Sequence, residues 1–329
     1  MNVPGWVWVA TIGGLLVLLA IDLVIVDRKP HEVTIGEAAR WVVFYVACAL
    51  IFGVGIWALS GAEYAAQFFT GYITEYSLSI DNLFVFVIIM STFSVPAIHQ
   101  HKVLLIGIVL ALIMRGIFIA LGSAVISRFS WVFYLFGLFL IYTAWKLARH
   151  GDDDDAEFKE NAALRMVRRI LPITDDYRGA KSFVREHGKL LVTPMFIVMV
   201  AIGTTDLLFA LDSIPAIFGL TKEPFLVFTA NAFALMGLRQ LYFLVGGLLD
   251  RLVYLSVGLA VVLGFIGIKL ILEAMHDNHL PFLNDGEGLP VPTIDIKVSL
   301  LVIVAVLGIT TVASLLKVRR DPDAVRKLD

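Results

Sequence analysis

Long apolar runs separated by short polar segments dominate the pattern along this chain. A membrane-spanning helix needs about 20 predominantly apolar residues. By that criterion the sequence predicts nine spans, near 5–26, 41–59, 72–93, 103–126, 129–148, 191–218, 224–247, 252–275 and 297–316. The first run has no basic N-terminal flank, so we expect a retained helix rather than a signal peptide. The predicted fold is an all-α polytopic membrane protein with a single transmembrane domain over 1–329.

Composition indicates the same class of protein. Of the 329 residues, 59% are hydrophobic and 16% are charged, against roughly half and about a quarter in soluble domains. Lysine plus arginine (26) nearly balance aspartate plus glutamate (28), so no basic surface indicates nucleic-acid binding. Cys48 is the single cysteine, which excludes an intrachain disulfide and a cysteine-rich metal centre.

Lysine and arginine indicate the orientation, because cytoplasmic segments concentrate them. With the N-terminus outside, 19 of the 26 fall in predicted inside segments and two fall in outside segments. This bias favours nine spans with the N-terminus out and the C-terminus in. The longest inside segment is the predicted cytoplasmic loop 149–190, which follows the fifth span.

One polar motif occurs twice inside the apolar runs. It reads Thr, an acid, five residues, Asp and a small hydrogen-bonding residue, over 74–82 in the third span and 205–213 in the sixth. The next span of each half contains one arginine, Arg115 or Arg239. Spans three to five (72–148) therefore correspond to spans six to eight (191–275). Because the offset of three spans is odd, the two copies cross the bilayer in opposite directions, as the inverted repeats of secondary transporters do.

The acids of the motif need partners, because a charge at the bilayer centre costs roughly 2.5–3.5 kcal/mol on insertion scales. Four acids face two arginines, so two acids remain for a cargo cation or for protons. Positions six apart lie 120° apart around a helix and about 9 Å apart along it. An ion site therefore takes residues from both repeats, or one helix unwinds, for which Pro215 offers a place. The acids are Glu75, Asp81, Asp206 and Asp212.

The donors in and near the motif are oxygen atoms, which suit Mg²⁺, Ca²⁺ and Mn²⁺ better than Cu(I) or Zn²⁺. Carboxyl groups in a low dielectric also bind protons readily, which permits antiport. We expect Asp81 and Asp212 to bind the cation, and Glu75 or Asp206 to exchange protons. Residues expected to couple or gate transport are Asp22, Thr74, Thr205, Ser213, Arg115, Arg239 and Asn231.

At these residues the sequence resembles the TerC/Alx family of bacterial membrane proteins. The resemblance is carried by Glu75-Tyr-Ser-Leu-Ser-Ile-Asp81-Asn82 and by Thr205-Asp206-Leu-Leu-Phe-Ala-Leu-Asp212-Ser213. It implies export of Mn²⁺ from the cytoplasm across the bacterial plasma membrane, by a fold similar to the LysE-type exporters. It also implies that Mn²⁺ is cargo, with no prosthetic group. The metal ligands implied are Glu75, Asp81, Asn82, Asp206 and Asp212.

Four other functions compete with this one. An intramembrane aspartic protease also uses two aspartates on two spans, but Ile80 and Leu211 stand where that class has the second Gly of Gly-x-Gly-Asp. Tellurite export is disfavoured because carboxylates repel an oxyanion. An assembly or metal-supply factor, docked to secretory machinery through 149–190, stays open, as do a Ca²⁺ antiporter and a homo-oligomer. We therefore expect a transporter rather than an enzyme, with Mn²⁺, protons and lipid as partners.

Overall fold

A computed structural model of the chain describes residues 1, 3–27, 34–126, 128–129, 131–150, 172–174, 177–179, 181–186, 189–245, 252–276 and 288–321. These residues form nine helices and one β-hairpin. The helices are α1 (Gly5–Asp27), α2 (Ile35–Ser60), α3 (Ala62–Thr92), α4 (Ala97–Ile126), α5 (Val132–His150), α7 (Pro194–Phe218), α8 (Pro224–Val245), α9 (Leu255–His276) and α10 (Ile296–Arg320). Each predicted span therefore corresponds to one helix.

Several helices begin earlier than the apolar runs predict. α2 starts at Ile35, where the Thr34 side chain accepts a hydrogen bond from the Glu37 backbone N–H at 3.3 Å. α3 begins at Ala62, ten positions before its predicted start, and continues through Glu63 and Gln67. A hydropathy criterion stops at such polar residues, whereas helical hydrogen bonding does not.

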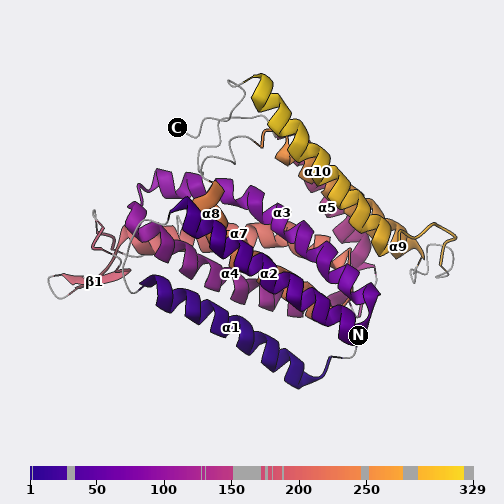
Figure 1. Ribbon diagram of the computed structural model, residues 1–329, viewed down its shortest axis with the longest axis horizontal. Coiled ribbons are helices and arrows are strands. Elements are labelled where there is room, and N and C mark those ends of the chain that lie inside the picture. Colours follow the sequence, from indigo (N-terminus) through magenta and orange to yellow (C-terminus); the bar gives the residue numbers. More distant parts are fainter. Residues whose placement is uncertain are drawn as a thin grey trace.

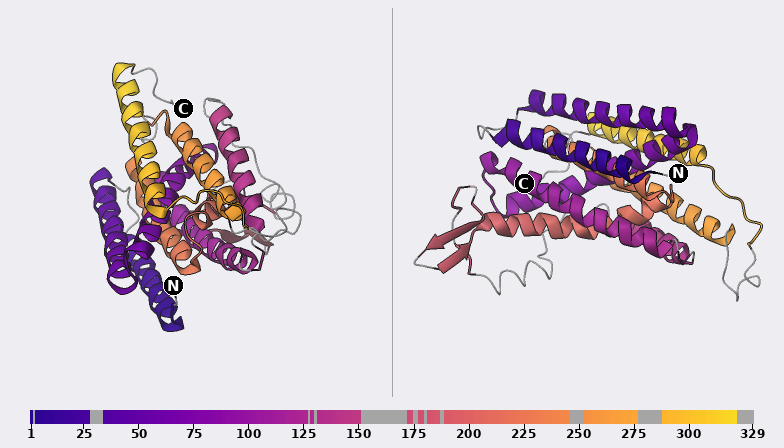
Figure 2. Two further views of the ribbon diagram at one scale, coloured as in Figure 1. Left: turned by 90° about the vertical axis from the view of Figure 1, so that its right-hand side faces the viewer. Right: turned by 90° about the horizontal axis from the view of Figure 1, so that it is seen from below.

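The predicted loop 149–190 contains a β-hairpin near its end. Strands β1 (Phe183–Glu186) and β2 (Lys189–Val192) pair antiparallel, with Phe183 opposite Val192. The predicted start of the sixth span at 191 is therefore wrong, because Lys189–Val192 forms β2 and α7 begins at Pro194. A proline fits the first helical turn, since its missing N–H would have no partner there. The hairpin projects beyond one end of the helices (Figures 1 and 2).

α8 is the most enclosed helix of the bundle. It packs against α2, α3 and α4, and most of its side chains are buried. α3 packs on α8 as α4 packs on α7, and α5 packs on α9. α1 and α10 lie on opposite edges of the bundle (Figure 1). The polar residues of α8, Asn231, Arg239 and Gln240, are therefore shielded from lipid by other helices.

The outer helices carry the apolar surface that a bilayer requires. Large exposed side chains include Trp57 (60%) on α2 and Leu301 and Ile309 (69% each) on α10. Among the described helices, seven are long and apolar enough to cross a membrane, and the described apolar part of α1, Gly5–Ile21, is shorter. The prediction of an all-α polytopic membrane protein is confirmed, with seven of its nine spans meeting this criterion.

Two helix contacts, α5 with α9 and α3 with α7, join the N-terminal and C-terminal halves of the chain. A Cβ atom on Gly137 of α5 would lie 2.8 Å from the Gly267 carbonyl oxygen, and one on Gly267 of α9 would lie 2.8 Å from the Gly137 carbonyl oxygen. The two backbones therefore touch, as small residues allow in membrane helices. α3 and α7 are antiparallel. Gln67, near the start of α3, accepts a hydrogen bond at 2.6 Å from Thr221, just after the end of α7. Glu75, further along α3, shares Arg115 with Asp206, which comes earlier in α7.

Candidate functional site

A buried arginine joins the two copies of the motif. Arg115 Nε and Nη2 donate hydrogen bonds to the two carboxylate oxygens of Asp206, each at 3.2 Å. Arg115 Nη1 donates to Glu75 Oε1 and, at 2.8 Å, to Asn231 Oδ1. Four helices, α3, α4, α7 and α8, thus each supply one member of what we name the Arg115 cluster: Glu75, Arg115, Asp206 and Asn231.

The cluster is closed to solvent. Glu75 is fully buried, and Arg115 and Asp206 are each 1% exposed. With both acids ionised, one guanidinium leaves the cluster a net charge of −1. The sequence left open whether each arginine neutralises one acid, and the structure shows instead that Arg115 binds two. Such charge-assisted, bidentate contacts are strong in a low dielectric.

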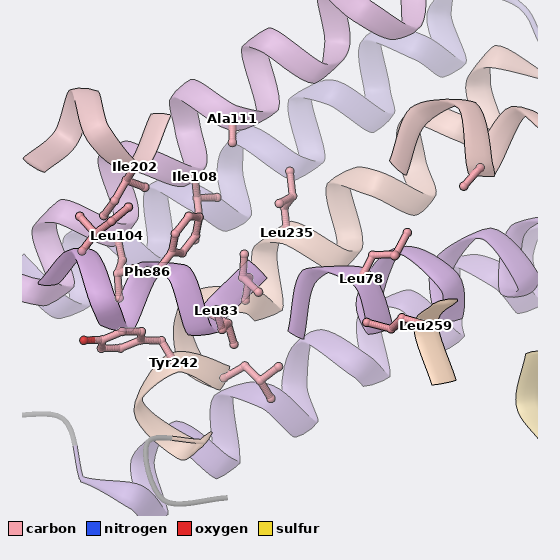
Figure 3. Close-up of a cluster of buried hydrophobic side chains, with 14 of the residues drawn as sticks. Leu78, Leu83, Phe86, Leu104, Ile108, Ala111, Ile202, Leu235, Tyr242 and Leu259 are labelled. Carbon is pink, nitrogen blue, oxygen red and sulfur yellow. The ribbon is translucent and has the colours of Figure 1, made fainter. Parts of the chain in front are cut away.

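Apolar layers lie one helical turn from the cluster on both sides. On the side of the α3 end at Thr92, the layer is Leu78, Ala111, Ile202 and Leu235, all within one hydrophobic core. In the view of Figure 3, Ala111 and Leu235 lie between Ile202 on one side and Leu78 on the other. On the opposite side, a second core contains Ile119, Ala210 and Val227. Each of these residues lies three or four positions from a cluster residue on the same helix, so apolar side chains flank the cluster along each helix in both directions.

Several buried polar atoms of α3, α7 and α8 have no hydrogen-bond partner within the described part of the chain. They include Thr74 Oγ1, Glu75 Oε2, Ser213 Oγ, and both amide atoms of Gln240. Three of these residues belong to the repeated motif. An unsatisfied buried polar group costs about 1–3 kcal/mol, so these atoms are expected to meet water, a proton or an ion during function.

Gln240 and Ser79 are buried polar residues that the sequence pattern did not single out. Gln240 is 1% exposed and follows Arg239 within an apolar run, which is the signal that could have identified it. Ser79 donates a hydrogen bond to Glu75 Oε1 at 3.3 Å. It was visible as a polar residue one turn after Glu75, on the same face of the helix.

The side chains of Asp22, Asp81 and Asp212 lie outside the described residues, so their predicted roles remain predictions. The helix positions of Asp81 and Asp212 are known. Each lies six residues after its cluster acid, but α3 and α7 are antiparallel, so the two positions lie on opposite sides of the cluster. Six residues rise about 9 Å, which separates them by about 18 Å along the bundle. α7 also runs unbroken through Pro215.

Three further predicted residues are Asn82, Thr205 and Arg239. Asn82 and Thr205 are buried, each 8% exposed, and lie outside the Arg115 cluster. Arg239 is 1% exposed on α8, two residues after Gly237, which faces Tyr76 of α3. α3 and α8 run parallel, so Arg239 lies nearer the level of position 81 than that of Glu75.

The described side chains contain no group of three or more His, Cys, Asp or Glu residues that could hold a metal ion. Glu75 and Asp206, predicted as ligands, are engaged by Arg115 instead. In this conformation a guanidinium therefore occupies the space between the corresponding acids of the two motifs.

A cavity of about 670 Å³ opens at the end of the bundle where α3 begins. It is bounded by the ends of α7 and α9 and by the start of α10, and its lining includes Gln67 and Thr221. Lys222 and Glu273 form an ion pair there at 2.9 Å, and Lys269 is 6% exposed. The Gln67–Thr221 pair lies about two helical turns from Glu75, so the cavity approaches the cluster from this end.

Comparison with known proteins identifies relatives of the chain. The family model of the integral membrane protein TerC family matches residues 60–322. An uncharacterised membrane protein of Mycobacterium tuberculosis strain H37Rv is 49% identical over 319 residues, covering 95% of this chain and 80% of the relative. An uncharacterised membrane protein of Myxococcus xanthus is 42% identical over 319 residues, covering 97% and 94%.

The similarity extends to proteins with a suggested role. Alx of Escherichia coli K12, whose name proposes a membrane-bound redox modulator, is 40% identical over 275 residues, covering 80% of this chain and 84% of Alx. No solved structure matches the chain. The family match includes the whole Arg115 cluster and both motif copies. The chain therefore belongs to the TerC family of integral membrane proteins.

Proposed function

We propose that this protein is a secondary transporter that exports a divalent cation, Mn²⁺, from the bacterial cytoplasm across the plasma membrane in exchange for protons. The observation that carries the proposal is Arg115, held between Glu75 and Asp206. A tethered cation between corresponding acids of two repeats is what an exchanger needs in its cargo-free state. It stabilises the acids while the site is empty, and it can be displaced when cargo or protons arrive.

An inverted repeat is part of the proposal, with α3–α5 corresponding to α7–α9. The antiparallel course of α3 and α7 supports it, as does the shared partner of Glu75 and Asp206. The reciprocal contact of Gly137 and Gly267, in the third helix of each half, is also expected near a two-fold axis. Inverted repeats of this kind place the transport site at their interface, near the bilayer midplane.

Asp81 and Asp212, the predicted cation ligands, fit two separate sites, one on each side of the Arg115 cluster, better than one shared site. We call these two sites half-sites. Positions 81 and 212 lie about 18 Å apart along the bundle, beyond the two apolar layers. Mn²⁺ takes oxygen ligands at short distances, so Asp81 and Asp212 would hold the ion at successive stages. Movement of one layer would connect one half-site with the Arg115 cluster at a time.

Glu75 is the better proton carrier of the two cluster acids. Both oxygens of Asp206 accept hydrogen bonds from Arg115, whereas Glu75 Oε2 has no partner among the described residues. A proton on Oε2 would bring the cluster from a charge of −1 to zero without breaking a contact with Arg115. This is a local event that a proton-coupled exchanger can use.

Three alternatives are less favoured: redox modulation, a membrane assembly or metal-supply factor, and Ca²⁺ as the cargo. The name of Alx proposes redox modulation for that protein; dithiol chemistry within this chain would need a second cysteine, and Cys48 is the single one. A membrane assembly or metal-supply factor would tolerate loss of the buried acids, whereas a transporter would not. Ca²⁺ in place of Mn²⁺ would use the same oxygen ligands.

Purified protein in sealed liposomes tests the proposal. External Mn²⁺ loss and internal pH would be followed together under an imposed pH gradient, for wild type, Asp81→Asn and Asp212→Asn. Asp321→Asn, at the end of α10 where Asp321 binds Lys317, is the matched control for loss of one carboxylate. We expect saturable Mn²⁺ flux with opposing proton movement in wild type and Asp321→Asn, and none in the other two variants.

Each of the other possible flux results leads to a different conclusion. Mn²⁺ flux without a pH change would remove proton coupling and keep the transporter. Larger flux with Ca²⁺ than with Mn²⁺ would change the cargo. Absence of flux for Mn²⁺, Ca²⁺ and Mg²⁺ in folded protein would overturn the transporter and favour the assembly factor.

A further inference from the structure

Gln240 is the most anomalous polar residue outside the Arg115 cluster. It is 1% exposed, and neither its amide oxygen nor its amide nitrogen has a hydrogen-bond partner in the described part of the chain. Its neighbours along α8 are enclosed by α2, α3 and α4 rather than by lipid. Burying an amide without hydrogen-bond partners costs about 1–3 kcal/mol of folding free energy for each unsatisfied group. A ligand or water that binds the amide would offset this cost.

Helix contacts fix the side of α8 on which Gln240 lies. Ala230 faces Gly71 of α3, and Gly237 faces Tyr76 of α3 and Tyr45 of α2. Gln240 is three residues after Gly237 and seven after Phe233, whose ring lies 4.9 Å from that of Phe52 of α2 and 6.2 Å from that of Phe68 of α3, so Gln240 lies on the side of α8 that faces both α2 and α3. Since α3 and α8 run parallel with this register, Gln240 lies opposite positions 79–80 of α3.

The facing surface of α3 is also polar. Glu75, Ser79 and Asn82 follow one another at intervals of four and three, which places them on one face of the helix. Ser79 donates a hydrogen bond to Glu75, and Asn82, two helical turns after Glu75, is 8% exposed. Gln240 thus lies beyond the apolar layer of Leu78 and Leu235, on the side of the bundle where α3 and α8 end.

We propose that Gln240 and Asn82 line a water-filled half-site between α3 and α8, in which the Gln240 amide oxygen binds a hydrated divalent cation. The amide oxygen is a neutral hard donor, which suits such ions, and the amide N–H groups bind their water. This inference deepens the proposed function and rests on it for the identity of the ion. The presence of water at Gln240 does not depend on transport.

Cysteine labelling tests the half-site directly, because the chain has one native cysteine. In a Cys48→Ala background, Gln240→Cys and Asn82→Cys would be treated in liposomes with a small cationic methanethiosulfonate reagent. Leu235→Cys is the matched control: it lies on the same helix, is fully buried and belongs to the apolar layer (Figure 3). We expect Gln240→Cys and Asn82→Cys to react at least about tenfold faster than Leu235→Cys, since a thiol in a dry core is inert.

One labelling result would contradict the proposed half-site. If both cysteines react no faster than Leu235→Cys in protein that melts cooperatively, the half-site is dry and the inference is wrong. Two labelled positions keep the test decisive when one variant fails to fold.

A binding measurement tests the ligand role. Mn²⁺ that binds the folded state raises its melting temperature with concentration. Removing one oxygen donor in Gln240→Leu should raise the half-saturating Mn²⁺ concentration at least about tenfold, which corresponds to roughly 1.4 kcal/mol, and Gln240→Asn should recover part of it. Unchanged half-saturation in Gln240→Leu would overturn Gln240 as a ligand. Labelling at Gln240 without any Mn²⁺ effect in wild type would instead refute the proposed cargo and retain the hydrated half-site.

Discussion

Glu75 and Asp206 bind the same guanidinium from opposite halves of the molecule. Glu75 uses one oxygen and Asp206 uses both, and Arg115 has no exposed path to water at 1% exposure. Two of the four acids in the repeated motif are thus already bound by an arginine in this conformation. Any cation that approaches these two carboxylates has to compete with Arg115 of α4.

Removing the arginine should destabilise the fold strongly. Arg115→Met leaves two buried carboxylates without a counter-charge, which costs about 3–5 kcal/mol. The triple variant Arg115→Met/Glu75→Gln/Asp206→Asn removes the charges as well, so it should recover much of that loss. Thermal melting of purified protein measures both. A triple variant no more stable than Arg115→Met would show that the charges are not the cause.

The two cluster acids should differ in their contribution to stability. Asp206→Asn loses half of a bidentate contact and leaves Arg115 with one carboxylate, at a cost of about 1.5–3 kcal/mol for charged hydrogen bonds. Either change brings the cluster to zero net charge, but Glu75→Gln keeps the bidentate Arg115–Asp206 pair, so it should cost less. Denaturation midpoints would compare them. In liposomes, Glu75→Gln should also lose proton movement, and retention of normal coupling would exclude Glu75 as the proton carrier.

Adding one methyl group at the contact of α5 with α9 should lower the stability of the fold. In Gly267→Ala the new Cβ atom would lie 2.8 Å from the Gly137 carbonyl oxygen and 2.9 Å from Ile141. Overpacking of this kind costs about 1–3 kcal/mol. Gly264→Ala is the control on the same helix, since its Cβ would meet Ala144 at an ordinary 3.6 Å. Equal melting temperatures for the two variants would refute the close crossing.

An ion pair outside the membrane should make stability depend on pH. The Met1 amine donates a hydrogen bond to Glu223, which raises the pKa of that amine above its ordinary value of 8.0. The pair therefore stabilises the folded state fully below pH 8, and this contribution is lost as pH rises through the raised pKa. The melting temperature of wild type should exceed that of Glu223→Gln at pH 7, and the difference should shrink towards pH 10. A constant difference would mean that the amine does not titrate in this range.

The sequence by itself determined the class of protein and the position of its helices. Long apolar runs cannot fold in water without lipid or protein around them, so nine runs gave nine helices, with errors at ends such as Ala62 and Pro194 where polar residues continue a helix or a strand precedes it. The repeated spacing also identified Glu75, Asp206 and Arg115, because ionisable residues within apolar runs are rare.

Only the tertiary structure decided which of these residues meet. Periodicity along one helix gives no register between helices, so it could not show that Arg115 binds Glu75 and Asp206 at once, or that Asn231 completes the cluster. It could not show that antiparallel packing of α3 and α7 moves positions 81 and 212 to opposite sides. Gln240 was equally hidden, because one polar residue in an apolar run becomes informative only when packing shows that neither of its amide atoms has a partner in the described chain.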